Sequence, residues 1–529
     1  MEKRRIRIVS ALAVLLAIAG LTFTTVPATA AETPQPGAAG IGDSLFPGLG
    51  NGGYDALAYS VNPHIPAGVP DQPVPSTERM NARATQALSR FNLDFGGPGA
   101  DAVTAVSVNG RPAVFDWQQE NQELVVTPAQ PICNGRVFHV DIAFASHPVT
   151  PDPANPYPDG WITTASGGSF TAFQAAKAHQ AFPVNDHPRD KAKWTFNIDV
   201  PDGVTAVANG TFAGTTESDG RATWKYESTD PLATELIQMA VGTDLQIIQR
   251  GTTAGVAFRD VIPASQRDLV EPLLAEGPDQ LRWAVAKIGK FPFRNYGNFV
   301  ADQLIGYSLE TQTMSMSSIV LFKPDYLPGK TGVDSFVLPI TLHELIHQYF
   351  GDSVSPYSWS DIWLNEGFAT YYEKWYAAEK GWLGAWGYPS FEAYVHDQYR
   401  LGDTMRHDDG PIAQPTPDVD LLDNYAIYDG GAVVLYALQQ EVGDSTFTAI
   451  MRGWAREFAG RSVSTGDFVR YASRVAGRDL TGFLNPWLYD THTPSMPGHP
   501  DWTVDPVTDT TVARMHADHP GRRALGLAA

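Results

Sequence analysis

Cysteine is almost missing from this chain of 529 residues, since Cys133 is the only one. A single thiol cannot form an internal disulfide, so packing of the core has to stabilise the fold unaided. A metal site built from several cysteines is excluded for the same reason. We expect Cys133 to be a small buried apolar group.

Basic residues are also few, with 37 Lys and Arg against 58 Asp and Glu, which gives a formal net charge of −21. A surface this acidic repels nucleic acid phosphates and anionic membranes, so neither is expected as a partner. Hydrophobic residues at 43% and charged residues at 18% are typical of a globular protein. The length indicates more than one domain.

The main long apolar run lies at the N-terminus. Basic residues between Lys3 and Arg7 precede the stretch "IVSALAVLLAIAGLTF", and small residues follow at Ala28–Ala30. This order is typical of a secretory signal peptide over residues 1–30, and the run is short for an uncleaved membrane anchor. The sequence therefore predicts a secreted protein without stable membrane association after cleavage.

The remaining chain changes character along its length. Residues 31–53 are rich in Gly and Pro and are expected to be a leader, and 495–529 are expected to be an extended or loosely packed tail. Residues 54–248 alternate in short strand-like runs, with Asn-Gly hairpin signals in "AVTAVSVNGRPAVFDW" and "GVTAVANGTFAGTT". From 249 to 494 the apolar spacing is mostly helical. The acidic stretch 402–410 is expected to be a solvated loop.

The stretch "HELIH" places His343 and His347 four residues apart. On a helix both imidazoles lie on one face and can reach one ion. Glu366 follows His347 by 19 residues in a second helical segment and supplies a third ligand. Two histidines and a carboxylate with an open fourth position form a catalytic zinc set, so we expect one Zn²⁺ per chain. Two satisfied core histidines are the alternative, and the pattern does not separate zinc from cobalt or manganese.

Glu344 adjoins a ligand without being needed as one. We expect it to act as general base, taking a proton from a zinc-bound water and passing it to the departing amine. A structural zinc site would have no use for such a carboxylate. Leu345 and Ile346 should point into the core.

These residues carry a resemblance to a known family. "HELIH", then 18 residues, then the glutamate of "NEGFA" resembles the gluzincin zinc metallopeptidases, in particular the aminopeptidase N-like family in a short secreted bacterial form. The similarity spans about residues 45–494. It implies an α+β multidomain protein, in which an N-terminal antiparallel β saddle domain precedes a thermolysin-like mixed α/β catalytic domain with a helical C-terminal half.

The stretch "GYSLETQT" is similar to the exopeptidase motif of that family. Glu310 matches the glutamate that binds the free α-amine of the substrate, which limits cleavage to the first residue. Tyr307 and Thr311 stand where the family usually has glycine and asparagine. Tyr307 is expected to narrow or reshape the first substrate pocket.

A tyrosine completes the implied catalytic set. Tyr428 resembles the family tyrosine whose hydroxyl donates to the developing oxyanion, and Tyr425 is the competing assignment. Asp361, Asn365 and Glu373 flank the third metal ligand and are candidates for orienting the ligands, or simple caps and surface charges.

A stretch of the β domain, "AFQAAKAHQAFPVNDHPRDKAKW", also resembles the family. Gln174 matches a glutamine that helps Glu310 to bind the amine, with a surface residue as the alternative. Val184 and His187 replace the usual cysteine and glutamate, which argues against a metal or redox role there.

The sequence thus predicts a secreted zinc aminopeptidase acting on peptides with a free N-terminus, with a monomer favoured. A zinc endopeptidase on the same site is one alternative, and an inactive peptide-binding protein with structural zinc is another. About 35 residues follow Pro494, too few for the C-terminal helical domain of larger family members. We therefore expect an open cleft.

Overall fold

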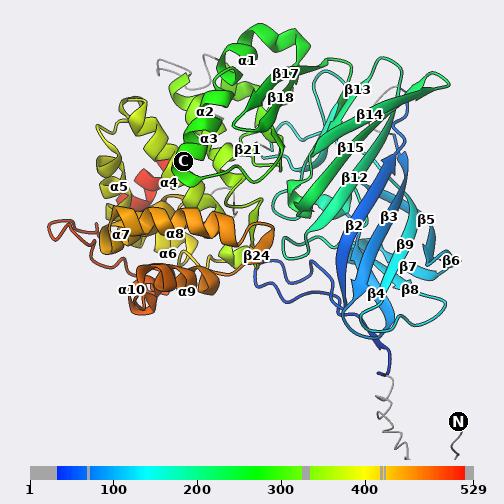
Figure 1. Cartoon of the computed structure of the whole chain (residues 1–529), viewed down its shortest axis with the longest axis horizontal. Coiled ribbons are helices and arrows are strands. Elements are labelled where there is room, and N and C mark those ends of the chain that lie inside the picture. The colour runs from blue at the N-terminus through cyan, green and yellow to red at the C-terminus, as the bar shows by residue number, and fades with distance from the viewer. Residues whose placement is uncertain are drawn as a thin grey trace, which may run out of the picture. The chain divides into compact units, whose positions relative to one another are not determined.

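The computed structural model describes six stretches of the chain, namely residues 32–67, 72–155, 157–323, 334–417, 421 and 424–518. The predicted signal peptide lies outside them. Residues from Pro34 onward belong to one compact unit. Up to about residue 263 this unit consists mainly of strands, and after it mainly of helices (Figure 1).

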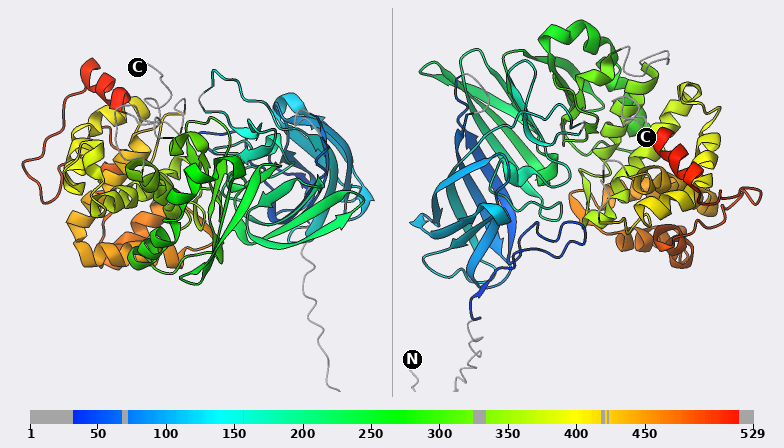
Figure 2. Two further views of the ribbon diagram at one scale, coloured as in Figure 1. Left: turned by 90° about the horizontal axis from the view of Figure 1, so that it is seen from above. Right: turned by 180° about the vertical axis from the view of Figure 1, so that it is seen from behind.

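The first half of this unit is built on an eight-stranded sheet of order β14-β15-β12-β2-β3-β9-β5-β6. Adjacent strands in this sheet are antiparallel, apart from the parallel pair β12 and β2. The strands are β2 (Tyr54–Pro63), β3 (Val74–Ala84), β5 (Ala100–Val108), β6 (Arg111–Pro112), β9 (Val137–Ser146), β12 (Ala192–Pro201), β14 (Thr211–Ser218) and β15 (Arg221–Leu232). The long strands twist as the sheet is followed from edge to edge (Figure 2).

Two four-stranded sheets accompany it. One has the order β1-β4-β8-β7 and the other β10-β11-β16-β13. Their strands are β1 (Gln35–Pro36), β4 (Leu88–Asp94), β7 (Val114–Gln118), β8 (Glu123–Thr127), β10 (Gly160–Thr163), β11 (Ser169–Ala172), β13 (Thr205–Ala208) and β16 (Met239–Gly242). One hydrophobic core joins the three sheets. The predicted N-terminal β domain followed by a helix-rich domain is therefore confirmed.

Alternation of side chains explains why these segments are strands. Along β3, every second residue from Val74 to Ala84 is buried and the residues between them are exposed or half-buried. Such a period of two buries one face of a strand against a core and leaves the other toward water.

The two Asn-Gly signals have different outcomes. Asn109 and Gly110 have φ values of 52° and 71° and join the paired strands β5 and β6, so this hairpin is confirmed. The hairpin expected at Asn209–Gly210 is wrong, because β13 and β14 lie in different sheets. The buried Asn209 side chain instead donates to the carbonyl of Gln312, in the second half of the chain.

The second half begins with a six-stranded sheet of order β17-β18-β20-β22-β21, with β19 beside β18. Its strands are β17 (Leu245–Thr253), β18 (Val256–Pro263), β19 (Asn295–Tyr296), β20 (Asn298–Ala301), β21 (Ser308–Leu309) and β22 (Ser315–Ser318). A short parallel pair, β23 (Val354–Pro356) and β24 (Arg461–Val463), lies apart from this sheet.

Helices make up most of the remainder. They are α1 (Arg267–Leu274), α2 (Gly277–Ile288), α3 (Asp334–His347), α4 (Trp363–Glu379), α5 (Phe391–Arg400), α6 (Gly402–Asp409), α7 (Gly431–Val442), α8 (Asp444–Glu457), α9 (Thr465–Ala476), α10 (Thr481–Tyr489) and α11 (Asp509–Asp518). Among the described residues, no helix has both the length and the apolar character needed to cross a membrane.

Three local expectations are wrong. Cys133 is exposed rather than buried. Residues 402–409 form helix α6, and Met405 is fully buried there, so this stretch is not a solvated loop. The tail expectation is wrong for residues 509–518, which form helix α11 with Met515 buried, whereas residues 501–508 have no helix or strand and are largely exposed, with the Trp502 ring stacked on Tyr436.

Glu78 allows a test of the β-domain core. It is 1% exposed on β3, and no described residue donates to either of its carboxylate oxygens. Burial raises the pKa of Glu78 well above its usual value of 4.5. The folded protein therefore keeps a proton that the unfolded chain loses above about pH 4.5, so the stability tied to this group falls as the pH rises.

Replacement Glu78→Gln removes this dependence. We expect the unfolding free energy of the variant, relative to the native chain, to increase by about 1.4 kcal/mol for each pH unit above 4.5 until the folded-state pKa is reached. Urea unfolding at pH 5, 6 and 7 measures the difference, with Glu217→Gln on the exposed strand β14 as control. A difference that stays constant with pH would contradict the prediction.

Candidate active site

Helices α3 and α4 bring three potential metal ligands together. Glu366 Oε2 lies 3.2 Å from His343 Nε2 and 3.1 Å from His347 Nε2, and the donor atoms of the three residues lie within 4.8 Å of one another. His347 is 1% exposed and Glu366 is 2% exposed. Leu345 and Ile346 are fully buried, as predicted.

The outer ring nitrogens have partners of their own. His343 Nδ1 lies 3.2 Å from Glu373 Oε2, and His347 Nδ1 lies 3.1 Å from the carbonyl oxygen of Phe350. Each acceptor holds a proton on Nδ1, which leaves the Nε2 lone pair directed at the shared point. Two neutral imidazoles and one carboxylate fit a catalytic zinc ion with an open coordination position.

The charged groups of this cluster are buried, and their pKa values depend on one another. Burial alone would raise the pKa of Glu366, but attraction by His347 and hydrogen bonds from both imidazoles bring it down to about 2. Burial disfavours a charged His343, yet its hydrogen bonds to Glu366 and Glu373 raise its pKa to about 9. A proton thus occupies the site when no cation is bound, and a metal ion would displace it.

Glu344 lies on the same helix and faces this cluster. It is 5% exposed, and its carboxylate approaches His347 and Glu310 with ligand atoms within 4.8 Å of one another. Burial raises the pKa of Glu344 to about 8, while His343 and His347 act in the opposite direction. A carboxylate beside an open metal position, with a raised proton affinity, is suited to general base chemistry.

Glu310 follows β21 and is held from two sides. Gln348, directly after the last histidine ligand, donates to the Glu310 carbonyl at 2.9 Å and accepts from the backbone of Thr313 at 2.7 Å. The β domain adds the Asn209 bond to Gln312 at 2.6 Å. These bonds fix the backbone that carries the Glu310 side chain next to the metal ligands, and the residue is 3% exposed.

Two substitutions in this motif have a local explanation. The Thr311 hydroxyl donates to the Met314 carbonyl at 2.5 Å, so it closes the turn internally. Tyr307 donates to the Pro158 carbonyl at 2.6 Å and packs against the β-domain core. Its hydroxyl thus contacts the β domain, and its effect on the first substrate pocket stays a prediction.

Tyr428 reaches the site from a π-helical turn, Ala426–Gly430. Its ring stacks on His343 with centroids 6.1 Å apart and planes 13° apart. Burial, together with the carboxylates of Glu366 and Glu310, raises the pKa of Tyr428 well above its usual range, so the hydroxyl keeps its proton. Tyr425 belongs to the hydrophobic core instead.

A close contact between two glycines permits this arrangement. A Cβ on Gly367 of α4 would lie 2.7 Å from the Cα of Gly431, where α7 begins. Side chains at either position would push the two helices apart. The contact therefore sets how near Tyr428 comes to the metal ligands.

Comparison with known proteins agrees with this geometry. Residues 290–487 match the peptidase family M1 domain, and residues 85–236 match the peptidase M1 N-terminal domain. The M1 zinc metallopeptidase of Deinococcus radiodurans has a similar structure, with a TM-score of 0.72 and 27% identity, over 87% of this chain and 99% of that one. The chain belongs to the peptidase M1 family.

Longer M1 relatives share only part of their length with it. The aminopeptidase N of Streptomyces lividans is 26% identical over 341 residues, which is 60% of this chain and 38% of the relative. That of Lactococcus lactis is 24% identical over 353 residues, which is 63% of this chain and 39% of the relative. The chain thus spans about two fifths of the length of these relatives.

The remaining sequence candidates divide into two groups. Glu373 lies beside a metal ligand, as noted above, whereas Asp361 accepts from Thr465 and so joins two helix starts. Gln174 is buried, but of the contacts among the described residues none joins it to Glu310, so its role stays a prediction.

Sequence reasoning missed Gln348 and Lys374 as contributors to this M1 site. Lys374 donates to Glu373 at 2.6 Å and lies over the Trp386 ring, 4.0 Å from its centroid. The position of Gln348 directly after "HELIH" was an available signal, whereas the Lys374 contact with Trp386 depends on tertiary packing.

The Glu373 contact predicts a measurable effect on metal binding. Glu373→Gln replaces a charged acceptor of the His343 Nδ1 proton by a neutral one, so the zinc dissociation constant should rise about 10- to 100-fold. Competition with a chromogenic chelator measures it. Glu379→Gln is the matched control, because this glutamate ends the same helix and pairs with Lys287. Equal affinity of both variants would contradict the assigned role.

Proposed function

We propose that this chain is a secreted zinc aminopeptidase, which releases N-terminal residues from peptides. The observation that carries the proposal is the burial of Glu310 beside the metal ligands, with its carboxylate close to Glu344 and His347. An ammonium group held there would leave room for one residue between its α-amine and the scissile bond.

Each residue of the cluster then has a distinct task. Zinc held by His343, His347 and Glu366 would supply a Lewis acid that polarises the scissile carbonyl and lowers the pKa of water. Glu344 would accept the proton of the attacking water and return it to the leaving amine. Tyr428 would donate its hydroxyl proton in a hydrogen bond to the carbonyl oxygen as negative charge grows on it.

The α-amine gives the reaction its direction along the peptide. Glu310 would bind the substrate ammonium in a charge-assisted hydrogen bond, which is strong in a site shielded from water. Gln174 is proposed as a second contact to that amine. A variant of the Deinococcus radiodurans enzyme has been solved with a Tyr-Ser-Ala substrate, which supports a peptide as the substrate class here.

Secretion is supported by the sequence of residues 1–30 alone, with its basic start, apolar run and small residues before the cleavage position. The acidic net charge suits a soluble extracellular protein.

A pair of substrates tests the proposal directly. The zinc-loaded native chain should hydrolyse an aminoacyl anilide and leave its N-acetylated counterpart intact. Glu310→Gln should lower kcat/KM for the free-amine substrate by about 10²-fold or more, because the ammonium loses its charged partner. Steady-state kinetics on both substrates provides the measurement.

Glu344→Gln is the control, since it should retain the metal and lose about 10²–10⁴-fold in kcat. Cleavage of N-acetylated peptides at internal bonds would instead identify an endopeptidase. Zinc-loaded protein that cleaves neither substrate would indicate a peptide-binding protein with structural zinc.

A further inference from the structure

The two ligand helices are separate elements, so something has to fix how they face one another. The segment from Gln348 to Ile362 joins them and contains β23 and a 3-10 turn, Trp359–Asp361, that leads directly into α4. Side chains from the N-terminal half of the chain bind both ends of this segment, as the contacts below show.

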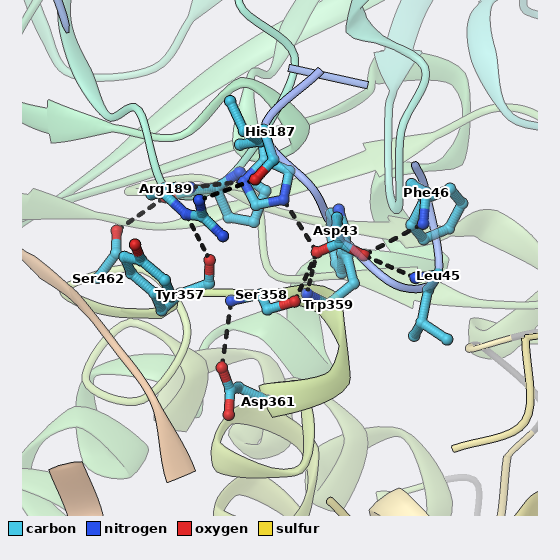
Figure 3. A network of polar contacts seen from close by, with 12 residues as sticks. Asp43, Leu45, Phe46, His187, Arg189, Tyr357, Ser358, Trp359, Asp361 and Ser462 are labelled. Carbon is cyan, nitrogen blue, oxygen red and sulfur yellow. Dashed lines mark hydrogen bonds and ion pairs between the residues drawn. The ribbon is translucent and has the colours of Figure 1, made fainter. Parts of the chain in front are cut away.

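Asp43 caps the start of the 3-10 turn that leads into α4. It belongs to residues 31–53, the stretch expected to be a leader. Asp43 Oδ2 accepts from the Ser358 hydroxyl at 2.7 Å and from the backbone of Trp359 at 2.8 Å, more than 300 residues away in sequence. Figure 3 shows the carboxylate at the centre of this network. A carboxylate at the first N–H groups of a helical run satisfies orphan donors and complements the helix dipole.

Asp43 is held in place from its other side. Its Oδ1 accepts from the backbones of Leu45 and Phe46 at 2.8 and 3.1 Å, and its Oδ2 lies 3.0 Å from His187 Nε2 of the β domain. The residue is 2% exposed. Burial would raise the pKa of Asp43, but these donors hold it well below its usual value, so the carboxylate stays ionised.

A cationic side chain, Lys191, binds the turns that follow α3. Lys191 Nζ donates to the carbonyls of Asp352 and Ser353 at 2.6 and 3.1 Å. These carbonyls lie in the turns that follow α3, five and six residues beyond His347, and the backbone of Asp352 donates to the carbonyl of His347 at 2.9 Å. Lys191 therefore ties the chain that leaves α3 to the β domain.

Two further contacts join the β domain to the same region, one at Tyr357 and one at Ser462 of β24. Arg189 Nε donates to the Tyr357 carbonyl at 3.0 Å, and its guanidinium lies over the Tyr357 ring, 3.8 Å from the centroid. The Ser462 hydroxyl donates to the Pro188 carbonyl at 2.8 Å. We name Asp43, His187, Arg189 and Lys191 together the clasp.

We infer that Asp43 and Lys191 are positioning residues of the metal centre, which set the orientation of α4 and its Glu366 relative to the two histidines of α3. This inference rests on the metal centre proposed above. Glu366 lies seven residues beyond Trp359, so it is about 10 Å along the helix axis from the cap. A change of tilt at the cap therefore moves the Glu366 carboxylate relative to both imidazoles.

Metal affinity of the full chain is the appropriate measurement, because the loss of a purely structural contact would lower stability and leave the metal affinity unchanged. In chelator competition at pH 7.5, Asp43→Ala should raise the zinc dissociation constant about tenfold or more, with the far-UV circular dichroism of the folded protein retained. An unchanged constant would overturn the inference.

The chain offers a matched control in Asp244. This carboxylate lies 21 residues before Ser265 and accepts from the backbone and hydroxyl of that residue in a 3-10 turn, Ala264–Gln266. That turn leads into α1, which carries none of the proposed metal ligands. Asp244→Ala should leave the zinc affinity within about twofold of native, and a loss equal to that of Asp43→Ala would contradict a specific role for the clasp.

Lys191 supplies an independent test, which also serves if Asp43→Ala does not fold. Lys191→Met should raise the zinc dissociation constant, and Lys191→Arg, which keeps a cation, should restore most of the affinity. Native affinity in Lys191→Met, or no recovery in Lys191→Arg, would count against the inference. If the native chain itself bound no zinc, the proposed function would be wrong. If the native chain bound zinc and the variants bound it equally well, only the inference about Asp43 and Lys191 would be wrong.

Discussion

The packing of α3 against α4 is the constraint on which the rest of the structure depends. Three donor atoms can share one ion only if two helices from different parts of the chain keep a fixed distance and rotation. Nearly every residue of α4 is buried, so it is a core helix surrounded on all sides. Such a helix cannot rotate without disturbing the packing of its neighbours, which is why the site is precise although its ligands are few.

The packing of these helices gathers several buried carboxylates in one place. Glu310, Glu344, Glu366 and Glu373 are all at most 5% exposed and lie near one another. Buried carboxylates are costly unless cations accompany them. Lys374 pairs with Glu373, a divalent metal would pair with Glu366, and a substrate ammonium would pair with Glu310. Under the proposed function, the metal and the substrate would each neutralise one of these buried carboxylates.

The sequence was most informative where chemistry depends on spacing along one element. Four residues on a helix place His343 beside His347 whatever the rest of the chain does, and alternation along β3 is visible without any tertiary knowledge. Prediction failed where a tertiary partner overrides a local signal. Asn209–Gly210 has the composition of a hairpin turn, yet its hydrogen bonds go to the loop after Glu310 and to the segment of Leu236 and Gln238. The role of Asp43 was equally hidden, because its partners lie more than 300 residues away and only the fold brings them together.

The most direct test of this account is anomalous diffraction at the zinc absorption edge from crystals of the metal-loaded chain. The account predicts one strong peak per chain, about 2.0–2.2 Å from His343 Nε2, His347 Nε2 and an oxygen of Glu366. A strongest peak elsewhere, with these three side chains bonded only to one another, would contradict it.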